Sequence, residues 1–359
     1  MNGDLTRGPV LKTMLWFAAP MIAGNLLQQC YNVADTLIVG RFLGPDALAA
    51  VGSAFTLMTF LTSILLGLCM GSGAVFSIRF GQRDQAALEE GICAAFVLIA
   101  ALATALCLAA FAGVDWIIAF LKVPAGVRGV MREYLVVIFW GIAATFLYNF
   151  FASLLRALGN SAVPLVFLAV SAVLNIALDL WFVLGLDLGV AGAAAATVIA
   201  QYVSGLGIAA YAWLRCPALR AGASRRRLRW ACVREIAGFS FLTCLQQSVM
   251  NLGILLVQGL VNSFGTTVMA AFAAAVKIDA FAYMPVQDFG NAFSTFIAQN
   301  FGARKARRIR QGLRCAVWAA LGFCAVISVA VWALARPLML LFVSGQETAI
   351  LAEGVRYLR

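Results

Sequence analysis

The sequence predicts an all-α protein that crosses a membrane many times and consists of two similar six-helix lobes, the second of them incomplete. Three observations predict this class: an apolar composition, apolar segments of spanning length, and a long internal repeat. Hydrophobic residues make up 63% of the 359 residues, charged residues only 11%, and the mean hydropathy is +0.95. A water-soluble domain of this composition would expose one continuous apolar surface.

Apolar segments long enough to cross about 30 Å of hydrocarbon recur from one end of the chain to the other. Their lengths favour helices over a β-barrel, whose strands need only about 9–11 residues. The predicted spans are 14–38, 48–77, 91–114, 131–153, 161–185, 189–214, 235–261, 268–297 and 313–335, with a tenth that starts near 350.

The internal repeat predicts the arrangement of these spans. Residues 20–95 align with residues 241–316 at a constant shift of 221 and without a gap, so that Gly81 matches Gly302. Six spans precede the second copy, and six is even, so both copies begin on the same side of the membrane. We therefore expect a pseudo-two-fold axis along the membrane normal rather than an inverted repeat.

The repeat also predicts the domain boundaries. We expect an amino-terminal six-helix lobe at 1–215, a basic linker at 216–234, and a partial second lobe at 235–359 with helices seven to nine and the start of helix ten. The counterpart of residues 136–215 is missing from the second copy, which leads us to expect a carboxy-terminal truncation. A fragment of a longer protein and a truncated gene both fit this expectation.

The charge distribution predicts the orientation. If the amino terminus is cytoplasmic, 18 Lys and Arg residues fall on the inner side and 5 on the outer side. This asymmetry predicts a multi-pass protein of a bacterial cytoplasmic membrane with its amino terminus inside. The net charge of +11 then reflects topology, and we expect the basic linker to face anionic lipid rather than nucleic acid. We expect a monomer.

The residue types exclude several chemistries. The chain has no His, and its nine Cys residues show no CxxC spacing. Imidazole catalysis and most zinc sites are therefore excluded, and the cysteines fit small buried residues. We predict no enzyme, no cofactor and no metal beyond a coupling ion.

A polar stripe marks the first predicted helix. Asn25, Gln28, Asn32 and Asp35 are spaced three, four and three residues apart, and Tyr31 lies one turn before Asp35. Such spacing places them on one helix face. A carboxylate at membrane depth is costly and must face a cavity or a partner. The stripe therefore predicts a water-filled path rather than a helix contact.

The fifth and sixth predicted spans, at 161–185 and 189–214, carry a second set of polar residues. Asn175 lies four residues before Asp179, and Thr197 lies four residues before Gln201. Carboxylate, amide and hydroxyl oxygens are ligands for a hard cation such as Na⁺. Two acids in one cavity would also suit a proton carrier. A hydrogen-bonded cluster between helices is the alternative.

The second lobe carries weaker signals. Gln247 and Asn251 give helix seven a polar face that lacks an acid. Lys277, Asp279 and Asp288 follow in helix eight, and the spacing of eleven allows an internal ion pair between Lys277 and Asp288. The roles of these three charged residues stay open.

Four stretches of the chain resemble the multidrug and toxic compound extrusion (MATE) family of transporters. They are Pro20 to Gly52, Arg156 to Pro164 (RALGNSAVP), Asn175 to Gln201, and Lys277 to Gly302. The resemblance implies a twelve-helix antiporter that exports organic, often cationic or aromatic, drugs and toxic compounds in exchange for Na⁺ or H⁺. Alternating access of a central cavity would move the substrate.

The resemblance also implies roles for individual residues. In the branch whose cation site lies in the amino-terminal lobe, the matching positions here are Asp35, Asn175, Asp179 and Thr197. Two helix prolines are hinge candidates, Pro20 and Pro285. The acids that another branch carries in helix seven are absent, because Gln246 and Gln247 stand there. Leu180 follows Asp179 where many relatives have Pro.

Two other functions remain as alternatives. A related flippase for lipid-linked substrates would share the two-lobe plan, but it should carry arginines in its cavity, and we expect the inner arginines to lie in loops. An intramembrane aspartyl protease would need a Tyr-Asp pair or a Gly-x-Gly-Asp motif, and the sequence contains neither.

Overall fold

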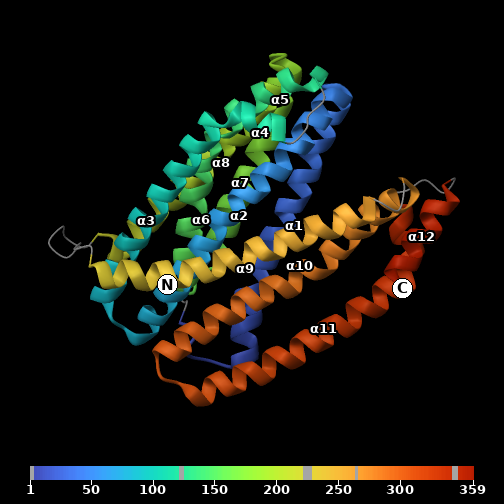
Figure 1. Cartoon of the computed structure of the whole chain (residues 1–359). Helices are drawn as coiled ribbons and strands as arrows, with labels where there is room; N and C mark the ends of the chain where they lie inside the picture. Colours follow the sequence, from blue (N-terminus) through green and yellow to red (C-terminus); the bar gives the residue numbers. More distant parts are fainter. Residues whose placement is uncertain (1–3, 121–124, 221–228, 263–265, 342–346) are drawn as a thin grey trace.

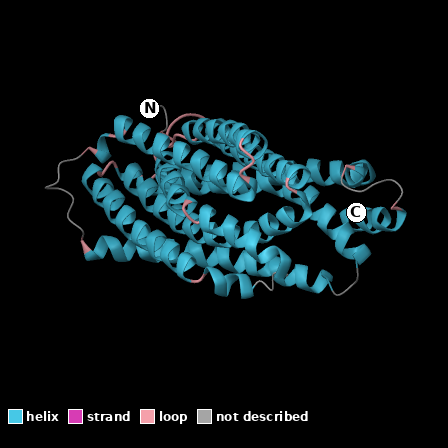
Figure 2. Ribbon diagram, turned by 90° about the horizontal axis from the view of Figure 1, so that it is seen from above, coloured by secondary structure: helices cyan, strands magenta, loops and turns pink. Residues whose placement is uncertain are grey.

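A computed structural model describes residues 4–120, 125–220, 229–262, 266–341 and 347–359, apart from some side chains, most of them in α2, α9 and α10. The described part of the chain is helical throughout (Figures 1 and 2). The long helices and their bounds are α1 Val10–Phe42, α2 Gly44–Gln82, α3 Gln85–Ala112, α5 Ala125–Ile138, α6 Gly141–Ala157, α7 Ala162–Leu180, α8 Gly189–Arg215, α9 Trp230–Asn262, α10 Thr266–Gly302 and α11 Ala306–Leu340. Shorter elements are α4 Val114–Phe120, the π-helix η1 Trp181–Gly185, the 3₁₀ helix η2 Pro217–Leu219 and α12 Thr348–Leu358.

The predicted all-α membrane fold is confirmed. Six helices of the described chain are long and apolar enough to cross a membrane, and a bent pair raises this number to seven. Those six are α1, α2, α3, α7 with η1, α8 and α11. Helices α9 and α10 have 33 and 37 residues and are also long enough to cross a membrane.

The fourth predicted span is not one helix. It was expected at 131–153, but the structure divides it into α5 and α6, which meet at an angle of 44°. Phe139 and Trp140 lie in the turn between them, and Gly141 follows as the first residue of α6. Gly141 packs so closely against the Gln201 side chain that an added Cβ would lie 2.5 Å from Oε1. The close approach of α8 thus coincides with the bend, which sequence hydropathy does not record.

The helices form two groups that meet near the amino terminus of the chain. The first group contains α1 to α8 and the second contains α9 to α12 (Figure 1). Helix α2 packs along α9, and α10 packs along α1 and α2. From this contact the upper ends of α1 and α2 diverge from the far ends of α9 and α10 (Figure 1).

The two copies of the repeat end their second helices in the same way. Arg83 after α2 and Arg304 after α10 are equivalent at the shift of 221, and both adopt left-handed backbone angles, with φ of 60° and 56°. The N–H of Arg83 donates to the Phe80 carbonyl and that of Arg304 to the Phe301 carbonyl, each at 3.0 Å. The repeat read from the sequence is therefore present in the backbone.

The same pseudo-symmetry appears where α2 crosses α10. Gly81 lies against the backbone of Gln299, and Gly302 lies against the backbone of Ile78. Both pairs are related by the shift of 221. A Cβ on either glycine would clash with a backbone carbonyl of the other helix, so glycine permits this close crossing. The pseudo-two-fold axis of the fold passes through this contact.

Candidate functional site: a polar cavity between the helix groups

A cavity of about 580 Å³ lies between the two helix groups. Its walls come from α1, α2, α5, α6, α7 and α8 of the first group and from α9 and α10 of the second. Polar side chains alternate there with methionine and aromatic ones, including Phe55, Met58, Tyr134, Tyr148 and Met284. This mixture suits an amphipathic organic compound.

The polar stripe of the first helix faces this cavity, as its spacing predicted. Gln28, Tyr31, Asn32 and Asp35 of α1 all line the wall, together with Asn25 nearer the amino-terminal end. Pro20 lies inside α1 and also borders the cavity. The position of the stripe on the cavity wall is therefore observed, whereas its role stays a prediction.

The residues expected to bind an ion lie on neighbouring helices. Asn175 and Asp179 of α7 are buried, with 2% and 0% exposure. The Asn175 amide donates to the Thr197 hydroxyl of α8 at 3.3 Å, and that hydroxyl donates to the Ala193 carbonyl at 3.1 Å. Asp35 of α1 lies within electrostatic reach of Asp179. The structure thus brings all four predicted residues together.

The buried oxygens of this cluster have no hydrogen-bond partners in the described chain. Both Asp179 carboxylate oxygens and the Asn175 side-chain oxygen are buried and unsatisfied. A buried acceptor without a donor is costly, so the cluster favours a positive ligand or a proton. Among the described residues no group of three or more His, Cys, Asp or Glu could hold a metal ion. Carboxylate, amide and hydroxyl oxygens are ligands of hard cations such as Na⁺, and a carboxylate also takes up a proton, so that binding of either ion here stays a prediction.

The second helix group contributes polar residues from α9 and α10. Gln247 of α9 and Asp288 of α10 line the cavity, and Gln201 of α8 does so from the first group. The side chain of Asn251, which we predicted to line the cavity, lies outside the described residues. Pro285 lies inside α10, as expected of a hinge candidate.

Asp288 pairs with Asn25 across the two groups. The Asn25 amide nitrogen lies 2.6 and 2.7 Å from the two carboxylate oxygens of Asp288. The sequence placed Asn25 on the polar stripe but did not identify this partner. Asp288 therefore accepts a hydrogen bond from α1, and its ion pair with Lys277 stays a prediction. Lys277 and Asp279 are exposed.

Arg156 does not lie in a loop, contrary to our expectation. We expected the inner arginines in loops, but α6 extends to Ala157, and Arg156 in its last turn lines the cavity. The predicted end of this span at residue 153 was too early, because the apolar pattern fades before the helix ends. Because Arg156 lines the cavity, the lack of a cavity arginine is no longer an argument against the alternative of a flippase for lipid-linked substrates.

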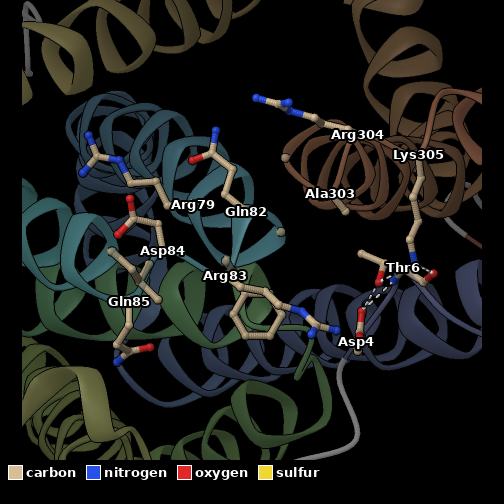
Figure 3. A pocket seen from close by; sticks show the side chains of 14 residues that line it. Asp4, Thr6, Arg79, Gln82, Arg83, Asp84, Gln85, Ala303, Arg304 and Lys305 are labelled. Carbon is tan, nitrogen blue, oxygen red and sulfur yellow. Dashed lines mark hydrogen bonds between the residues drawn. The ribbon is translucent and has the colours of Figure 1, made fainter.

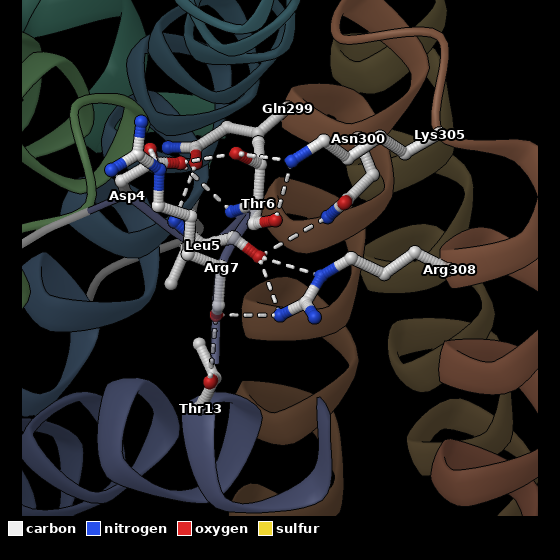
Figure 4. Close-up of polar contacts among 9 residues, drawn as sticks. All are labelled: Asp4, Leu5, Thr6, Arg7, Thr13, Gln299, Asn300, Lys305 and Arg308. Carbon is white, nitrogen blue, oxygen red and sulfur yellow. Dashed lines mark hydrogen bonds and ion pairs between the residues drawn. The ribbon is translucent and has the colours of Figure 1, made fainter. Parts of the chain in front are cut away.

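One glutamine closes the amino-terminal end of the cavity. The Leu5 N–H donates to Oε1 of Gln299 at 3.0 Å, and Nε2 of Gln299 donates to the Ala157 carbonyl at 2.7 Å. Gln299 is fully buried. Its side chain therefore joins the amino-terminal segment, α6 and α10 at one point. Figure 4 shows its bond to Leu5.

The amino-terminal segment is fixed to the second group by further bonds. Asn300 donates to the Leu5 carbonyl at 3.3 Å, and Lys305 donates to the Thr6 carbonyl at 2.8 Å. Arg308 of α11 donates to the carbonyls of Leu5 and Arg7 (Figure 4) and to that of Gly8. The segment before α1 therefore packs onto α10 and α11.

Asp4 orders this segment locally. Its carboxylate accepts hydrogen bonds from the Thr6 N–H at 2.9 Å and the Thr6 hydroxyl at 2.5 Å. It also pairs with Arg7 at 3.2 Å. Burial raises the pKa of Asp4, but the Thr6 hydrogen bonds and the Arg7 charge outweigh it and hold the pKa below its usual range.

A second hollow of about 810 Å³ lies outside this closing contact, where α2 and α10 end (Figure 3). Its wall is polar and carries both signs of charge, with Asp4, Arg83, Asp84, Arg304 and Lys305 among its residues. The closing contact therefore separates two hollows, one at the end of the molecule and one between the groups.

The fold and the cavity define a multi-pass helical membrane protein with a central cavity between two helix groups. The MatE family model matches residues 20–181 and 241–359. The chain therefore belongs to the MatE family, as the resemblance implied.

Relatives and solved structures agree with this assignment. The chain is 31% identical to the probable multidrug resistance protein YpnP of Bacillus subtilis, over 99% of this chain and 79% of that protein. It is 23% identical to the multidrug export protein MepA of Staphylococcus aureus, over 96% of this chain and 76% of that one. A solved outward-facing MATE family transporter covers all of this chain, which spans 80% of it, with a TM-score of 0.92 and 22% identity.

A second solved structure, a MOP superfamily transporter from Pyrococcus furiosus, has a TM-score of 0.91 at 23% identity. It also covers the whole of this chain, which spans 80% of it. At this identity both structures establish the fold alone. The fold is therefore that of a MATE transporter.

Proposed function

We propose that this chain exports organic, often cationic or aromatic, compounds across the cytoplasmic membrane in exchange for inward Na⁺ or H⁺. The observation that carries the proposal is the set of unsatisfied buried oxygens on Asn175 and Asp179, within electrostatic reach of Asp35, which lines a cavity between both helix groups. An ion that binds there changes the charge of the cavity wall. This arrangement therefore allows the protein to exchange that ion for a substrate.

The position of the closing contact supports alternating access as the transport mechanism. With the amino terminus on the cytoplasmic side, the contact at Gln299 closes the inner end and the diverging ends of the two groups face outward (Figure 1). This is the state that would release a drug and accept a cation. The inward state requires the Gln299 bonds and the Asn25–Asp288 bond to break, since both join the two groups.

The relatives named as a probable multidrug resistance protein and as a multidrug export protein support the choice of substrate class. The lining supports it as well, because Tyr31, Tyr134 and Tyr148 offer aromatic faces for flat cations. The protein would act as a monomer in the bilayer and needs no cofactor.

Uptake of the cationic dye ethidium into inside-out vesicles tests this proposal. A Na⁺ gradient and a proton gradient are imposed separately, and vesicles without the protein provide the background. We expect uptake above background with at least one of the two gradients. Uptake at the background rate under both gradients would contradict cation-coupled export.

A further inference from the structure

One cationic side chain faces the cavity, and the proposed ion site does not use it. Among the described residues that line the cavity, Arg156 is the only Lys or Arg. It lies in the last turn of α6, next to Ala157, whose carbonyl accepts the Gln299 bond that closes the cavity. Arg156 therefore stands at the closed end of the cavity.

The Nε–H of Arg156 is buried and lacks a protein acceptor among the described residues. No ion pair within 4.0 Å involves Arg156 among the described residues, whereas Arg79 in α2 pairs with Glu235 at 2.6 Å. A buried donor without an acceptor is costly, so this arrangement favours a ligand that supplies one.

The carboxylate of Asp288 does not supply this missing acceptor. Asp288 lies within electrostatic reach of Arg156, but both of its oxygens lie within 2.7 Å of the Asn25 amide. Asp288 therefore balances the charge of Arg156 without occupying its N–H groups. The Nε–H of the guanidinium remains available to a third group that enters from the cavity.

The surroundings suit an acid attached to an aromatic ring. Tyr148 lines the same cavity within electrostatic reach of Arg156, and its hydroxyl is held by the Pro164 carbonyl at 3.0 Å. Asn291 and Ser294 of α10 line the cavity from the second group and offer neutral donors. Arginine binds a carboxylate through two parallel hydrogen bonds, which a lysine does not reproduce.

We propose that Arg156 binds a carboxylate group of the transported compound, so that the cavity takes aromatic carboxylic acids as well as cations. This inference rests on the proposed export function and adds a substrate class to it. It also assigns opposite charges to two parts of one cavity, with Asp35 on α1 and Arg156 at the end of α6.

A matched pair of dyes tests the proposal. Rhodamine 110 carries a free carboxylic acid, and rhodamine 123 is its methyl ester with the same ring system. Binding of each dye to the purified protein is measured by fluorescence polarisation for the wild type, Arg156→Gln and Arg156→Lys. Arg314→Gln is the control, since Arg314 is an exposed cation on α11 that does not line the cavity.

We expect Arg156→Gln to weaken rhodamine 110 binding about 10- to 100-fold, the value of a charged hydrogen-bonded contact. Rhodamine 123 should change by less than about twofold, and Arg156→Lys should recover part of the loss. Arg314→Gln should leave both affinities unchanged. Equal losses for both dyes in Arg156→Gln would overturn the proposal, because they would indicate a structural role.

If Arg156→Gln does not fold, competition on the wild type decides the matter. Benzoate should displace rhodamine 110 at a concentration at least about tenfold lower than methyl benzoate does. Equal potency of the two competitors would overturn the proposal. Absence of dye transport in vesicles, with this binding preference intact, would contradict the export function and leave the assignment of Arg156 standing.

Discussion

Gly81 and Gly302 occupy equivalent positions on the two sides of the crossing between α2 and α10, each against the backbone of the opposite helix. They are related by the same shift of 221 residues that the sequence repeat shows. The lobes therefore meet through a contact that each copy of the repeat supplies in the same way. This contact lies beside the Gln299 bonds that close the cavity.

The first prediction concerns this crossing. Gly81→Ala should lower the free energy of unfolding by about 1–3 kcal/mol, because the new Cβ meets the Gln299 carbonyl. Gly302→Ala should have a similar effect through the Ile78 carbonyl. The measurement is the thermal unfolding midpoint in detergent.

Gly290→Ala is the matched control for this pair. Gly290 lies in the same helix α10, and nothing lies within 4 Å of a Cβ added there. Its midpoint should be unchanged or slightly higher, since alanine favours a helix over glycine. Equal losses in all three variants would show that the crossing has no special role.

The second prediction concerns the closing contact. Gln299→Ala removes the partner of both the Leu5 N–H and the Ala157 carbonyl. We expect hydrogen exchange of the segment around Leu5 to become about tenfold faster, which corresponds to about 1.4 kcal/mol. Gln85→Ala is the control, because Gln85 is exposed at the same end and donates to Glu89 on its own helix. Unchanged exchange in Gln299→Ala would contradict the role of this residue.

The third prediction is a pH dependence of the amino-terminal segment. The pKa of Asp4 is lowered in the folded state by Thr6 and Arg7. Its contribution is therefore fully present above the unfolded value of about 3.9, and it is lost as the pH falls through the lower folded pKa. Asp4→Asn at neutral pH should reproduce the low-pH state.

Hydrogen exchange of the segment before α1 measures this effect. Protection should fall below about pH 4 in the wild type, while Asp4→Asn should show the reduced protection at every pH. Asp115→Asn is a suitable control, since its carboxylate pairs with Arg132 between α4 and α5. A wild-type segment with the same protection at pH 3 and pH 7 would refute the assignment.

Much of the fold and part of the site were predictable from local patterns in the sequence. Spacing alone placed Asp35 on a polar face, and the i, i+4 pair of Asn175 and Asp179 on one face of a helix. Hydropathy fixed where long helices lie, because burial in lipid demands a continuous apolar segment. These features depend on neighbours within one helix.

Features that depend on contacts between helices were not predictable. The Asn25–Asp288 bond joins residues 263 positions apart, and the sequence shows only the polar face of each helix. The Gln299 bridge and the cavity position of Arg156 depend in the same way on how the groups meet. The break between α5 and α6 was missed because the hydropathy of a segment does not record a change in helix direction.

The central claim is that ion exchange at Asp35 and Asp179 drives export, and cation flux measured together with dye transport in proteoliposomes tests it most directly. We predict that dye added to the wild type drives a counterflow of Na⁺ or H⁺, and that Asp35→Asn and Asp179→Asn each abolish this counterflow while rhodamine 123 still binds. Counterflow at the wild-type rate in both variants would contradict the account.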